Sequence, residues 1–509
     1  MPELLEGGAL LDLVQREFIG LDTEHRTADG RTRRRIYLDS AATTLMFAPA
    51  HATASTFLRH NANTHSRIHF CARAATEAYA FARARVLSFV GADPRRYVCL
   101  FVGHGATGAI NRAAYYLAAY RRQAGTLVVS SMEHHSNDLP HRRVGPVARV
   151  PLTGKAPSLG TVDVDAFAAL LRERPRYAAV TMASNVTGII NPIAQLSELA
   201  HSNNVPLLLD ACQAIAHVPV RFQALGEPDA LVFSGHKVYA PGSPGVLIIR
   251  RDMVEAAQPA ELGGGMVRDV TRHEYRLAHD LAEREEAGTP NVVGAVTLSA
   301  VLEVLARIGM ETIAARERRL TEHLIEALGA IAGVRLYGST DLARHPRVGV
   351  ASFNLGNLDH GWVAAVLNDY YNIALRNQCF CAQPYARALV APELWKLDVP
   401  QDPGQAERLI RLRRGMVRAS LAMYSTRADI DGLAAALTDA RANAARYRKH
   451  YRCDDAGEHR HCSFSPPAAF DVVTEINALV QARLLSLAHE RRESRPRRHS
   501  AGKHQAQAP

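Results

Sequence analysis

A lysine stands directly behind a buried apolar run in this sequence, where it suggests chemistry more than packing. Lys237 ends the string SGHK, which follows the strand-like run DALVF. An amine that is partly removed from water has a lowered pKa and can form a Schiff base with an aldehyde. Taken alone, SGHK fits an exposed loop lysine somewhat better, so the assignment needs a second residue.

An aspartate supplies that second residue. Asp210 ends the preceding apolar run, PLLLD, 27 residues before Lys237. A carboxylate beside a pyridine nitrogen keeps that nitrogen protonated, and the cation draws electrons from a bound substrate, as the cofactor pyridoxal phosphate requires. An aspartate at a strand end is also a common helix cap, so the information lies in its pairing with Lys237.

A glycine-rich string lies between a buried run and a predicted helix. Gly103–Gly108 reads GHGATG and follows YVCLFV. Small residues let backbone N–H groups approach a phosphate at the start of a helix. The string also fits the GxGxxG pattern of dinucleotide-binding folds, which expect an acid about twenty residues further on. The nearest acid, Glu133, comes 30 residues after Gly103, and this alternative leaves Lys237 and Asp210 without a role.

Polar side chains follow two further apolar runs. His134 and His135 come after TLVVSS, and Asn185 lies in ASNVTG after YAAVTM. A histidine ring can stack on a flat cofactor and can transfer protons near neutral pH. Each of these residues alone would fit an ordinary loop.

The elements that would bring these residues together are those of an α/β fold. Short apolar runs alternate with helical patterns from about residue 36 to 250: IYLDS, YVCLFV, TLVVSS, YAAVTMAS, PLLLDA, DALVFSG and GVLIIR. Continuous apolar runs are typical of strands buried on both faces in a mostly parallel sheet wrapped by helices. Because ligands of such sheets bind beyond the carboxyl ends of the strands, the polar residues that end these runs should meet at one site.

The rest of the chain predicts a smaller α+β domain and an extension. A helical stretch covers about 294–331, strand signals follow in GVRLYG, VGVASFNL and NIALRN, and a helix lies near 430–437. We expect a large domain over 36–300 and a small domain formed by 1–35 and 301–440. The extension, 441–509, is polar and rich in turns, with a helix over about 470–487 and a basic tail.

Composition limits the possible classes of protein. With 509 residues, 47% hydrophobic and 22% charged, the chain is typical of a globular protein and not of a disordered one. It has no run of about 18 apolar residues and no secretory signal, so we expect a cytoplasmic protein without a membrane partner. Seven scattered cysteines fit reduced thiols. Part of the net charge of +10 comes from the basic tail, which we expect to be solvated and disordered rather than a nucleic-acid contact.

A set of strings matches a known family in order along about residues 36–430. The strings are YLDSAATT, NTHSRIH, GATGAIN, MEHHSN, SNVTGIINP, LLLDACQA, FSGHK, GGGM, EAGTPN, CAQP and VRASLAMYST. They resemble the class V aminotransferase group of pyridoxal phosphate enzymes. Within that group, the chain is most similar to cysteine desulfurases of the selenocysteine lyase type. The resemblance implies fold type I of the pyridoxal phosphate-dependent transferases and a homodimer.

The resemblance also implies a role for each matching residue. Lys237 would carry pyridoxal 5′-phosphate, His134 would stack on its ring, and Asp210 would face the pyridine nitrogen. The other cofactor contacts would be Gln213 on the phenolic oxygen side, Asn185 beside the cofactor, Ala106, Thr107, Ser234 and His236 at the phosphate, and Thr289, which in the family reaches the phosphate of the partner subunit. The substrate carboxylate would be held by Arg418, with Arg376 and Asn185 close by.

Cys381 is the residue that the resemblance expects to define the reaction. It opens CAQP five residues after Arg376, at the place of the family's nucleophile. Its thiolate, favoured by Arg376 and His134, would attack the sulfur of a cysteine substrate. The products would be alanine and a persulfide on Cys381, whose sulfur would pass to an acceptor protein. No metal is expected.

The sequence departs from the family pattern at several places. An extra cysteine, Cys379, is a second reactive thiol or filler, and we favour filler. Residues 382–417 form a long segment with three prolines that could serve as a lid, and Gly108 stands where an acid is frequent. The extension carries a group whose spacing is not that of a zinc site: Cys453, His459, His461 and Cys462.

These departures keep two alternatives open. One is another class V reaction, such as transamination, epimerisation or lyase chemistry on a different amino acid, with selenocysteine as one possible substrate. The other is a non-catalytic sulfur carrier or nucleic-acid-binding protein, which ranks last because every expected cofactor contact is present.

Overall fold

The computed structural model describes residues 5–64, 66, 68–121, 124–394, 401–406, 415–454, 457–465 and 471–493. The chain divides into two compact units, Met1–Cys462 and Ser463–Pro509. The second unit contains the helix α17 (Val472–Glu493), close to the helix expected over 470–487. Several of its apolar side chains are exposed, Ile476, Leu479 and Leu484 among them. The basic tail that follows lies outside the described residues.

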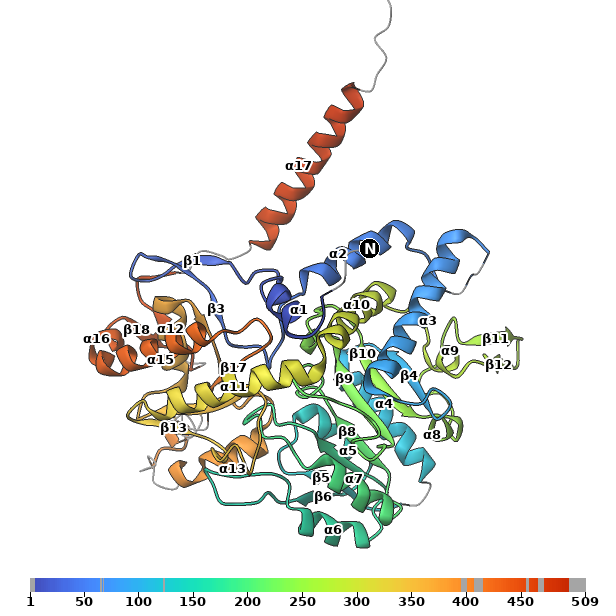
Figure 1. Ribbon diagram of the computed structural model, residues 1–509, viewed down its shortest axis with the longest axis horizontal. Coiled ribbons are helices and arrows are strands. Elements are labelled where there is room, and N and C mark those ends of the chain that lie inside the picture. The colour runs from blue at the N-terminus through green and yellow to red at the C-terminus, as the bar shows by residue number, and fades with distance from the viewer. Residues whose placement is uncertain are drawn as a thin grey trace, which may run out of the picture. The chain divides into compact units, whose positions relative to one another are not determined.

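A seven-stranded sheet forms the centre of the first unit (Figure 1). Its order is β4 (Tyr97–Val102), β10 (Gly245–Arg250), β9 (Ala230–Ser234), β8 (Leu207–Asp210), β7 (Ala178–Thr181), β5 (Leu127–Ser130) and β6 (Val147–Val150). Only β10 runs antiparallel to its neighbours, β4 and β9. The mostly parallel α/β sheet expected from the apolar runs is therefore confirmed.

Both faces of this sheet are covered, which explains why its strands are apolar without alternation. In β8, Leu207 and Leu209 point into one core and Leu208 points into another. The helix α4 (Gly105–Tyr120) packs on the face of Leu208, and α10 (Val292–Ile308) belongs to the core on the opposite face. Successive side chains of a strand point to opposite faces, so each strand needs apolar residues at every position when helices lie on both sides.

Two expectations about the strands were incomplete. The run IYLDS does not join the large sheet, because β3 (Ile36–Tyr37) pairs in parallel with β15 (Ile373–Ala374). The large sheet instead gains β6, which the apolar pattern missed. This edge strand reads VARV and is only partly buried, so it shows no continuous apolar run.

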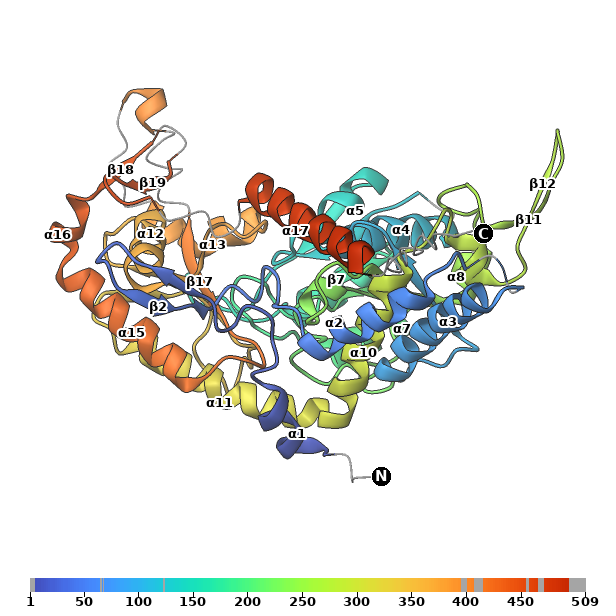
Figure 2. The ribbon, with the colours of Figure 1, turned by 90° about the horizontal axis from the view of Figure 1, so that it is seen from above.

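A second, antiparallel sheet of four strands lies in the small lobe. Its order is β13 (Val334–Leu336), β14 (Val350–Leu355), β17 (Met416–Ser420) and β16 (Arg376–Gln378). Three helices bury the other side of its core: α11 (Met310–Gly329), α12 (His360–Tyr371) and α15 (Arg427–Ala442) (Figure 2). In β17, Val417 and Ala419 face these helices, so Arg418 and Ser420 point to the opposite side. The domain boundaries expected at 36, 300 and 440 stay predictions.

The helical stretch expected over 294–331 is two helices. α10 and α11 meet at Gly309, whose φ of +84° favours glycine, and their axes differ by 81°. Among the described residues, no single helix has the length and apolar character needed to cross a membrane; only α10 and α11 taken together are long and apolar enough, and they are bent relative to each other.

Two segments hold more regular structure than the sequence suggested. Part of the expected long loop after Cys381 is the helix α13 (Gln383–Leu394), with Pro392 near its end. Its apolar side chains Tyr385, Ala386 and Leu389 are buried beside the sheet. In the extension, α16 (Ala444–Arg448) leads into a hairpin of β18 (Tyr451–Cys453) and β19 (His459–His461).

The histidines of that hairpin have partners within the protein. His459 pairs with Asp359, and the ring of His461 is hydrogen-bonded to the Tyr370 hydroxyl. Within the described parts of the chain, no group of three or more His, Cys, Asp or Glu side chains is arranged to hold a metal ion.

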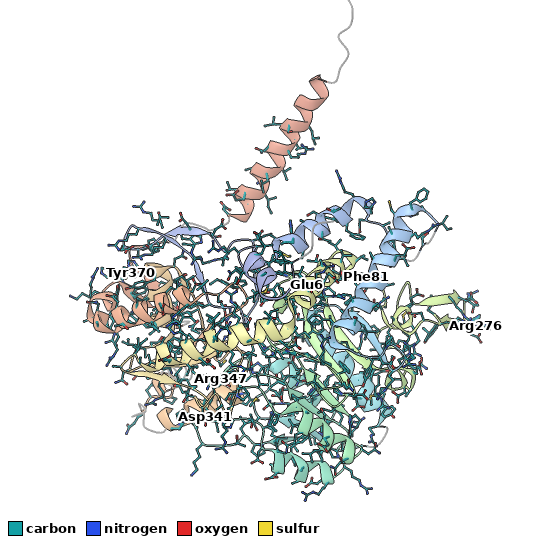
Figure 3. The ribbon with its side chains drawn as sticks, viewed as in Figure 1. Glu6, Phe81, Arg276, Asp341, Arg347 and Tyr370 are labelled. Carbon is teal, nitrogen blue, oxygen red and sulfur yellow. The ribbon has the colours of Figure 1, made fainter. Side chains whose placement is uncertain are left out.

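The other helices, strands and turns complete the first unit. They are α1 (Gly7–Val14), β1 (Glu24–Arg26), β2 (Thr32–Arg34), α2 (Ala48–Phe57), α3 (Phe70–Val90), α5 (Leu139–Val144), α6 (Val164–Arg172), α7 (Ile193–Ser202), α8 (Arg251–Glu255), β11 (Val267–Val270), β12 (Tyr275–Leu277) and α9 (Leu281–Glu285), with three short 3-10 turns, η1 (Leu58–His60), η2 (His135–Asn137) and η3 (Gly235–Lys237). The hairpin β11–β12 projects from the body of the unit, and Figure 3 shows Arg276 on it.

Candidate active site

A cavity of about 240 Å³ lies at the carboxyl ends of the central strands. It collects nearly all the residues singled out in the sequence: Ala106, Thr107, His134, Asn185, Asp210, Gln213, Ser234, His236, Lys237, Arg376, Cys381 and Arg418. The topology explains this convergence, since parallel strands end at the same edge of the sheet. Among these residues, Asp210 ends β8 and Lys237 ends the turn η3 that follows β9, the neighbouring strand.

Thr289 is the exception. It lines a larger neighbouring cavity of about 1290 Å³, which also reaches Gly105 and Thr107. Within one chain, Thr289 therefore lies apart from the smaller cavity, on the side where α4 begins.

The start of α4 forms a cradle that only glycine fits. Gly105 has a φ of +61°, and a Cβ there would lie 2.7 Å from Ser234 Oγ. Gly245 packs so closely that its Cβ would lie 2.1 Å from the Gly105 carbonyl oxygen. The Ser234 hydroxyl is buried and has no hydrogen-bond partner among the described residues. An unpaired hydroxyl beside the N-terminus of a long helix suits an anionic group such as a phosphate.

The ring of His134 is held with one nitrogen toward the backbone. Its Nδ1 accepts a hydrogen bond from the Ser136 N–H at 3.1 Å. Burial lowers the pKa of His134 to about 3, and the positive charge of Lys237 acts in the same direction. The ring is therefore uncharged near neutral pH, which suits stacking but removes the positive charge that the sequence analysis expected it to offer to Cys381.

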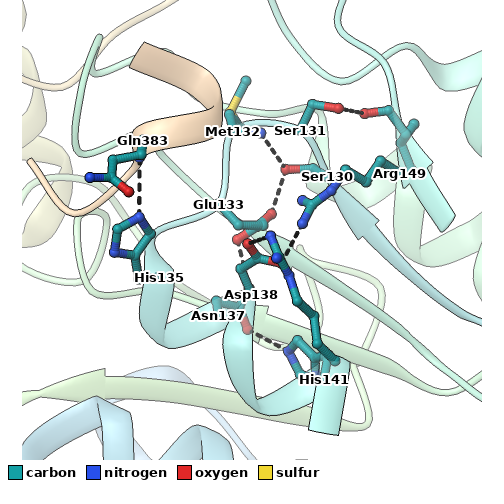
Figure 4. Close-up of polar contacts among 12 residues, drawn as sticks. Ser130, Ser131, Met132, Glu133, His135, Asn137, Asp138, His141, Arg149 and Gln383 are labelled. Carbon is teal, nitrogen blue, oxygen red and sulfur yellow. Dashed lines mark hydrogen bonds and ion pairs between the residues drawn. The ribbon is translucent and has the colours of Figure 1, made fainter. Parts of the chain in front are cut away.

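Next to His134, a buried carboxyl group holds the turn in place (Figure 4). Glu133 Oε1 accepts from Ser130 Oγ at 2.5 Å and from the Thr181 N–H at 2.8 Å, and Oε2 accepts from Asn137 Nδ2 at 2.7 Å. Burial raises the pKa of Glu133 to about 8, and the charge of Asp210 adds to this effect. Because Glu133 is buried and fully bonded, it cannot serve as the ribose-binding acid of the dinucleotide alternative.

The polar chain continues away from Glu133. Asn137 Oδ1 lies 3.1 Å from His141 Nε2, and His141 Nδ1 lies 2.8 Å from the Tyr177 hydroxyl. These residues are all buried. The turn that carries His134 is thereby tied to β7 and to the segment before it. Apart from the polar residues of MEHHSN, no pattern in the sequence indicated this network.

Arg418 is buried, as its position on the inner face of β17 requires. Its two terminal nitrogens donate to the Asn185 carbonyl oxygen at 2.9 Å and to Asp39 Oδ1 at 3.1 Å. Its Nε is buried and has no partner in the described part of the chain. Arg376 lies on the other side of Asp39, with 3.9 Å between Nη1 and Oδ2. Asp39, which the sequence marked only as a strand end, thus accepts a hydrogen bond from Arg418 and lies near Arg376.

Cys381 lies at the cavity with an exposed side chain. The neighbouring Phe380 is buried, and the guanidinium of Arg418 lies 4.8 Å from its ring centre. Cys379 does not line the cavity and instead packs against the core around α13. That placement fits the filler interpretation of Cys379 better than that of a second reactive thiol.

A family model, curated proteins and solved structures are similar to this chain over most of its length. The family model described as aminotransferase class V matches residues 36–433. The chain belongs to the class V aminotransferase family. Among curated relatives, a cysteine desulfurase of Dickeya dadantii is 35% identical over 408 residues, which cover 79% of this chain and 90% of the relative. A cysteine desulfurase of Klebsiella pneumoniae is 36% identical over 79% of this chain and 92% of its own length.

Solved structures agree with these relatives. The apo cysteine desulfurase of Thermococcus onnurineus has a TM-score of 0.72 and 27% identity, covering 86% of this chain and 99% of its own. The cysteine desulfurase CsdA of Escherichia coli, in an S-sulfonic acid form, has a TM-score of 0.68 and 29% identity over 86% and 98%. The expected resemblance and the fold type I architecture are therefore confirmed.

Proposed function

We propose that this protein is a pyridoxal phosphate-dependent cysteine desulfurase, which takes sulfur from L-cysteine, releases L-alanine and leaves a persulfide on Cys381. The observation that carries the proposal is the exposed thiol of Cys381 at the same small cavity as Lys237, Asp210 and Arg418. The relatives and the solved structures, which are named cysteine desulfurases, support it.

The donor set of the cavity fits the cofactor. Ser234 Oγ is a buried hydroxyl without a partner in the described residues, and it lies beside the glycine cradle at the first turn of α4, where a phosphate would be held. Asp210 and Gln213 lie at and just after the end of β8, the neighbour of β9, where a ring would sit, and His134 would cover that ring. When bound, the cofactor supplies an aldehyde for covalent attachment and a ring that stabilises negative charge on the substrate.

Each side chain of the site would have its own role in the reaction. Lys237 Nζ would hold the cofactor and, once displaced by the substrate amine, would take the proton from the substrate α-carbon. Arg418 would bind the substrate carboxylate through its unpaired Nε–H, because Asp39 and the Asn185 carbonyl oxygen already fix the plane of the guanidinium. Arg376 supplies positive charge beside Cys381, a role that the uncharged His134 does not fill.

Cys381 would carry out the sulfur transfer. Its thiolate forms an S–S bond to the substrate sulfur while the substrate Cβ–S bond breaks. The electron pair of the broken bond stays on the carbon fragment, which takes up one proton at Cβ and regains one at Cα, and leaves as alanine. The outer sulfur of the persulfide then passes to a thiol acceptor, which the exposure of Cys381 would allow to approach.

We further propose a homodimer in which Thr289 contacts the phosphate held by the partner subunit. The cavity that Thr289 lines reaches Gly105 and Thr107, so a second copy could complete the phosphate site from that side. The division into a large domain over 36–300 and a small domain belongs to the same proposal.

A pair of cysteine variants tests the function. In Cys381→Ser, formation of alanine from cysteine should fall by at least about a hundredfold, because the nucleophile is lost, while the cofactor colour remains. Cys462→Ser, which removes another exposed thiol in the β19 region, is the matched control and should behave as the wild type. Equal turnover in Cys381→Ser would refute the desulfurase. Keto acid or epimerised product from other amino acids in that variant would favour another class V reaction.

A further inference from the structure

The backbone of the loop that carries Cys381 is strained. Gln378, Phe380 and Cys381 have φ values of +89°, +54° and +54°, and none of them is glycine. A residue other than glycine is strained in this region of φ and stays there only when its surroundings hold it. The loop therefore needs contacts from outside to keep this conformation.

Several of these contacts come from the cavity wall. Asn185 Nδ2 donates to the Phe380 carbonyl oxygen at 2.7 Å, and Arg418 covers the Phe380 ring. These two residues are already part of the binding site. They hold the residue before Cys381 but do not touch the residues that follow it.

Two hydrogen bonds join the residues at and after Cys381 to a different segment of the chain, and both involve His135. Its backbone N–H donates to the Cys381 carbonyl oxygen at 2.7 Å, and its ring Nε2 accepts from the Gln383 N–H at 3.2 Å (Figure 4). Gln383 is the first residue of α13, where a helix has N–H groups without internal partners. The imidazole therefore caps α13 from another segment of the chain. Together, the two hydrogen bonds of His135, to the Cys381 carbonyl oxygen and from the Gln383 N–H, form a clasp around Cys381.

We propose that His135 is a positioning residue, whose side chain fixes where the Cys381 thiol stands relative to the cofactor site. This proposal deepens the proposed desulfurase function and rests on it for the role of the thiol. His134 faces the cavity and His135 holds the loop, so one dipeptide links the cofactor site to the nucleophile. Without the imidazole, the backbone strain would favour an open loop and a thiol that points away.

The clasp works only while Nε2 has a free lone pair. Burial lowers the pKa of His135, and Arg142 acts in the same direction while Asp138 opposes it. The other groups around the ring are His134 on the same turn and the uncharged Gln383 backbone. Protonation of Nε2 would set an N–H against the Gln383 N–H, so the loop should open on the acid side of the His135 titration.

Alkylation of the thiols in the intact holoprotein tests this proposal without any substrate. Iodoacetamide is added, and the rates at Cys381 and Cys462 are read separately by peptide mass spectrometry, with the exposed Cys462 as the internal reference. The variants are His135→Ala, which removes the ring, and Gln383→Pro, which removes the N–H together with the glutamine side chain at a helix position where proline is well accepted. His135→Gln retains an acceptor, and His51→Ala removes an exposed histidine of α2 as the matched control.

His135→Ala and Gln383→Pro should each raise the alkylation rate of Cys381 about threefold to tenfold relative to Cys462, as expected for one lost hydrogen bond. The double variant should show no further increase, His135→Gln should recover part of the effect, and the acid-side rise of the wild type should vanish in His135→Ala. Unchanged rates in both single variants, or fully multiplicative effects in the double variant, would overturn the proposal. If the rates behave as expected but the holoprotein makes no alanine from cysteine, the proposed function fails while the clasp stands.

Discussion

Glu133 offers the sharpest test of the buried network under the cofactor site. Its pKa is about 8 in the folded protein, against an ordinary value of 4.5. The folded protein therefore keeps a proton that the unfolded chain gives up. The stabilisation from this group is fully present below pH 4.5 and is lost as the pH rises through 8. Between about pH 6 and about pH 8, the loss amounts to about 2 kcal/mol, because the slope of about 1.4 kcal/mol for each pH unit falls to half as the pH reaches the folded pKa.

Glu133→Gln removes this dependence while keeping the shape of the side chain. The amide oxygen can still accept from Ser130 and from the Thr181 N–H. The new amide NH₂ faces the NH₂ of Asn137, so the Asn137 amide must rotate by half a turn to present its oxygen. Its NH₂ then faces His141 Nε2, so the ring proton of His141 must move to Nδ1. We expect the variant to lose about 1 kcal/mol at about pH 6, the value of a hydrogen bond, and to match or exceed the wild type above pH 8.

The measurement is the urea midpoint of the holoprotein at about pH 6 and about pH 9, for the wild type and the variant. Glu198→Gln, which changes an exposed glutamate of α7, is the control and should keep the pH dependence of the wild type. A Glu133→Gln protein whose midpoint falls with pH as steeply as that of the wild type would refute the reasoning, because another group would then carry the titration.

The site suggests two further substitutions. Arg418→Lys should raise the KM for cysteine about tenfold or more, because an ammonium group cannot bind Asp39, the Asn185 carbonyl oxygen and a carboxylate in one plane; steady-state kinetics measure this, and an unchanged KM would contradict the assigned role. Gly245→Ala should yield protein that binds the cofactor poorly, since its Cβ would lie 2.1 Å from the Gly105 carbonyl oxygen, whereas Gly264→Ala, with open space around it, should bind normally. The absorbance of the bound cofactor measures how much each variant binds. Equal cofactor content in Gly245→Ala and Gly264→Ala would contradict the role of the glycine cradle in cofactor binding.

The sequence predicted the large sheet because helices on both faces demand apolar residues at every strand position. The same reasoning located Asp210 and Lys237 at neighbouring strand ends. It failed for β6, whose partly exposed residues lack that pattern, and for β3, which pairs with a strand more than 330 residues away. The apolar pattern of a strand indicates which of its faces are buried, but it does not indicate which strand it pairs with.

The binding residues could be named from motifs, while the groups that orient them could not. Asp39 and Glu133 act through contacts with Arg418 and with Thr181, which are distant in the chain. Strand alternation in β17 does explain, after the fact, why Arg418 faces the cavity. The burial that makes His134 uncharged depends on packing from several segments, so no local pattern could reveal it.

The pairing of β3 has a consequence for how the chain is made. The Leu38 N–H donates to the Ala374 carbonyl oxygen, and the Ser420 N–H donates to the Leu38 carbonyl oxygen. At a synthesis rate of about 5–20 residues per second, the ribosome needs roughly 20–80 s after Leu38 to deliver Ser420. During that interval the segment that bears Asp39 lacks these two partners, so the contact between Asp39 and Arg418 forms only after most of the first unit has been synthesised.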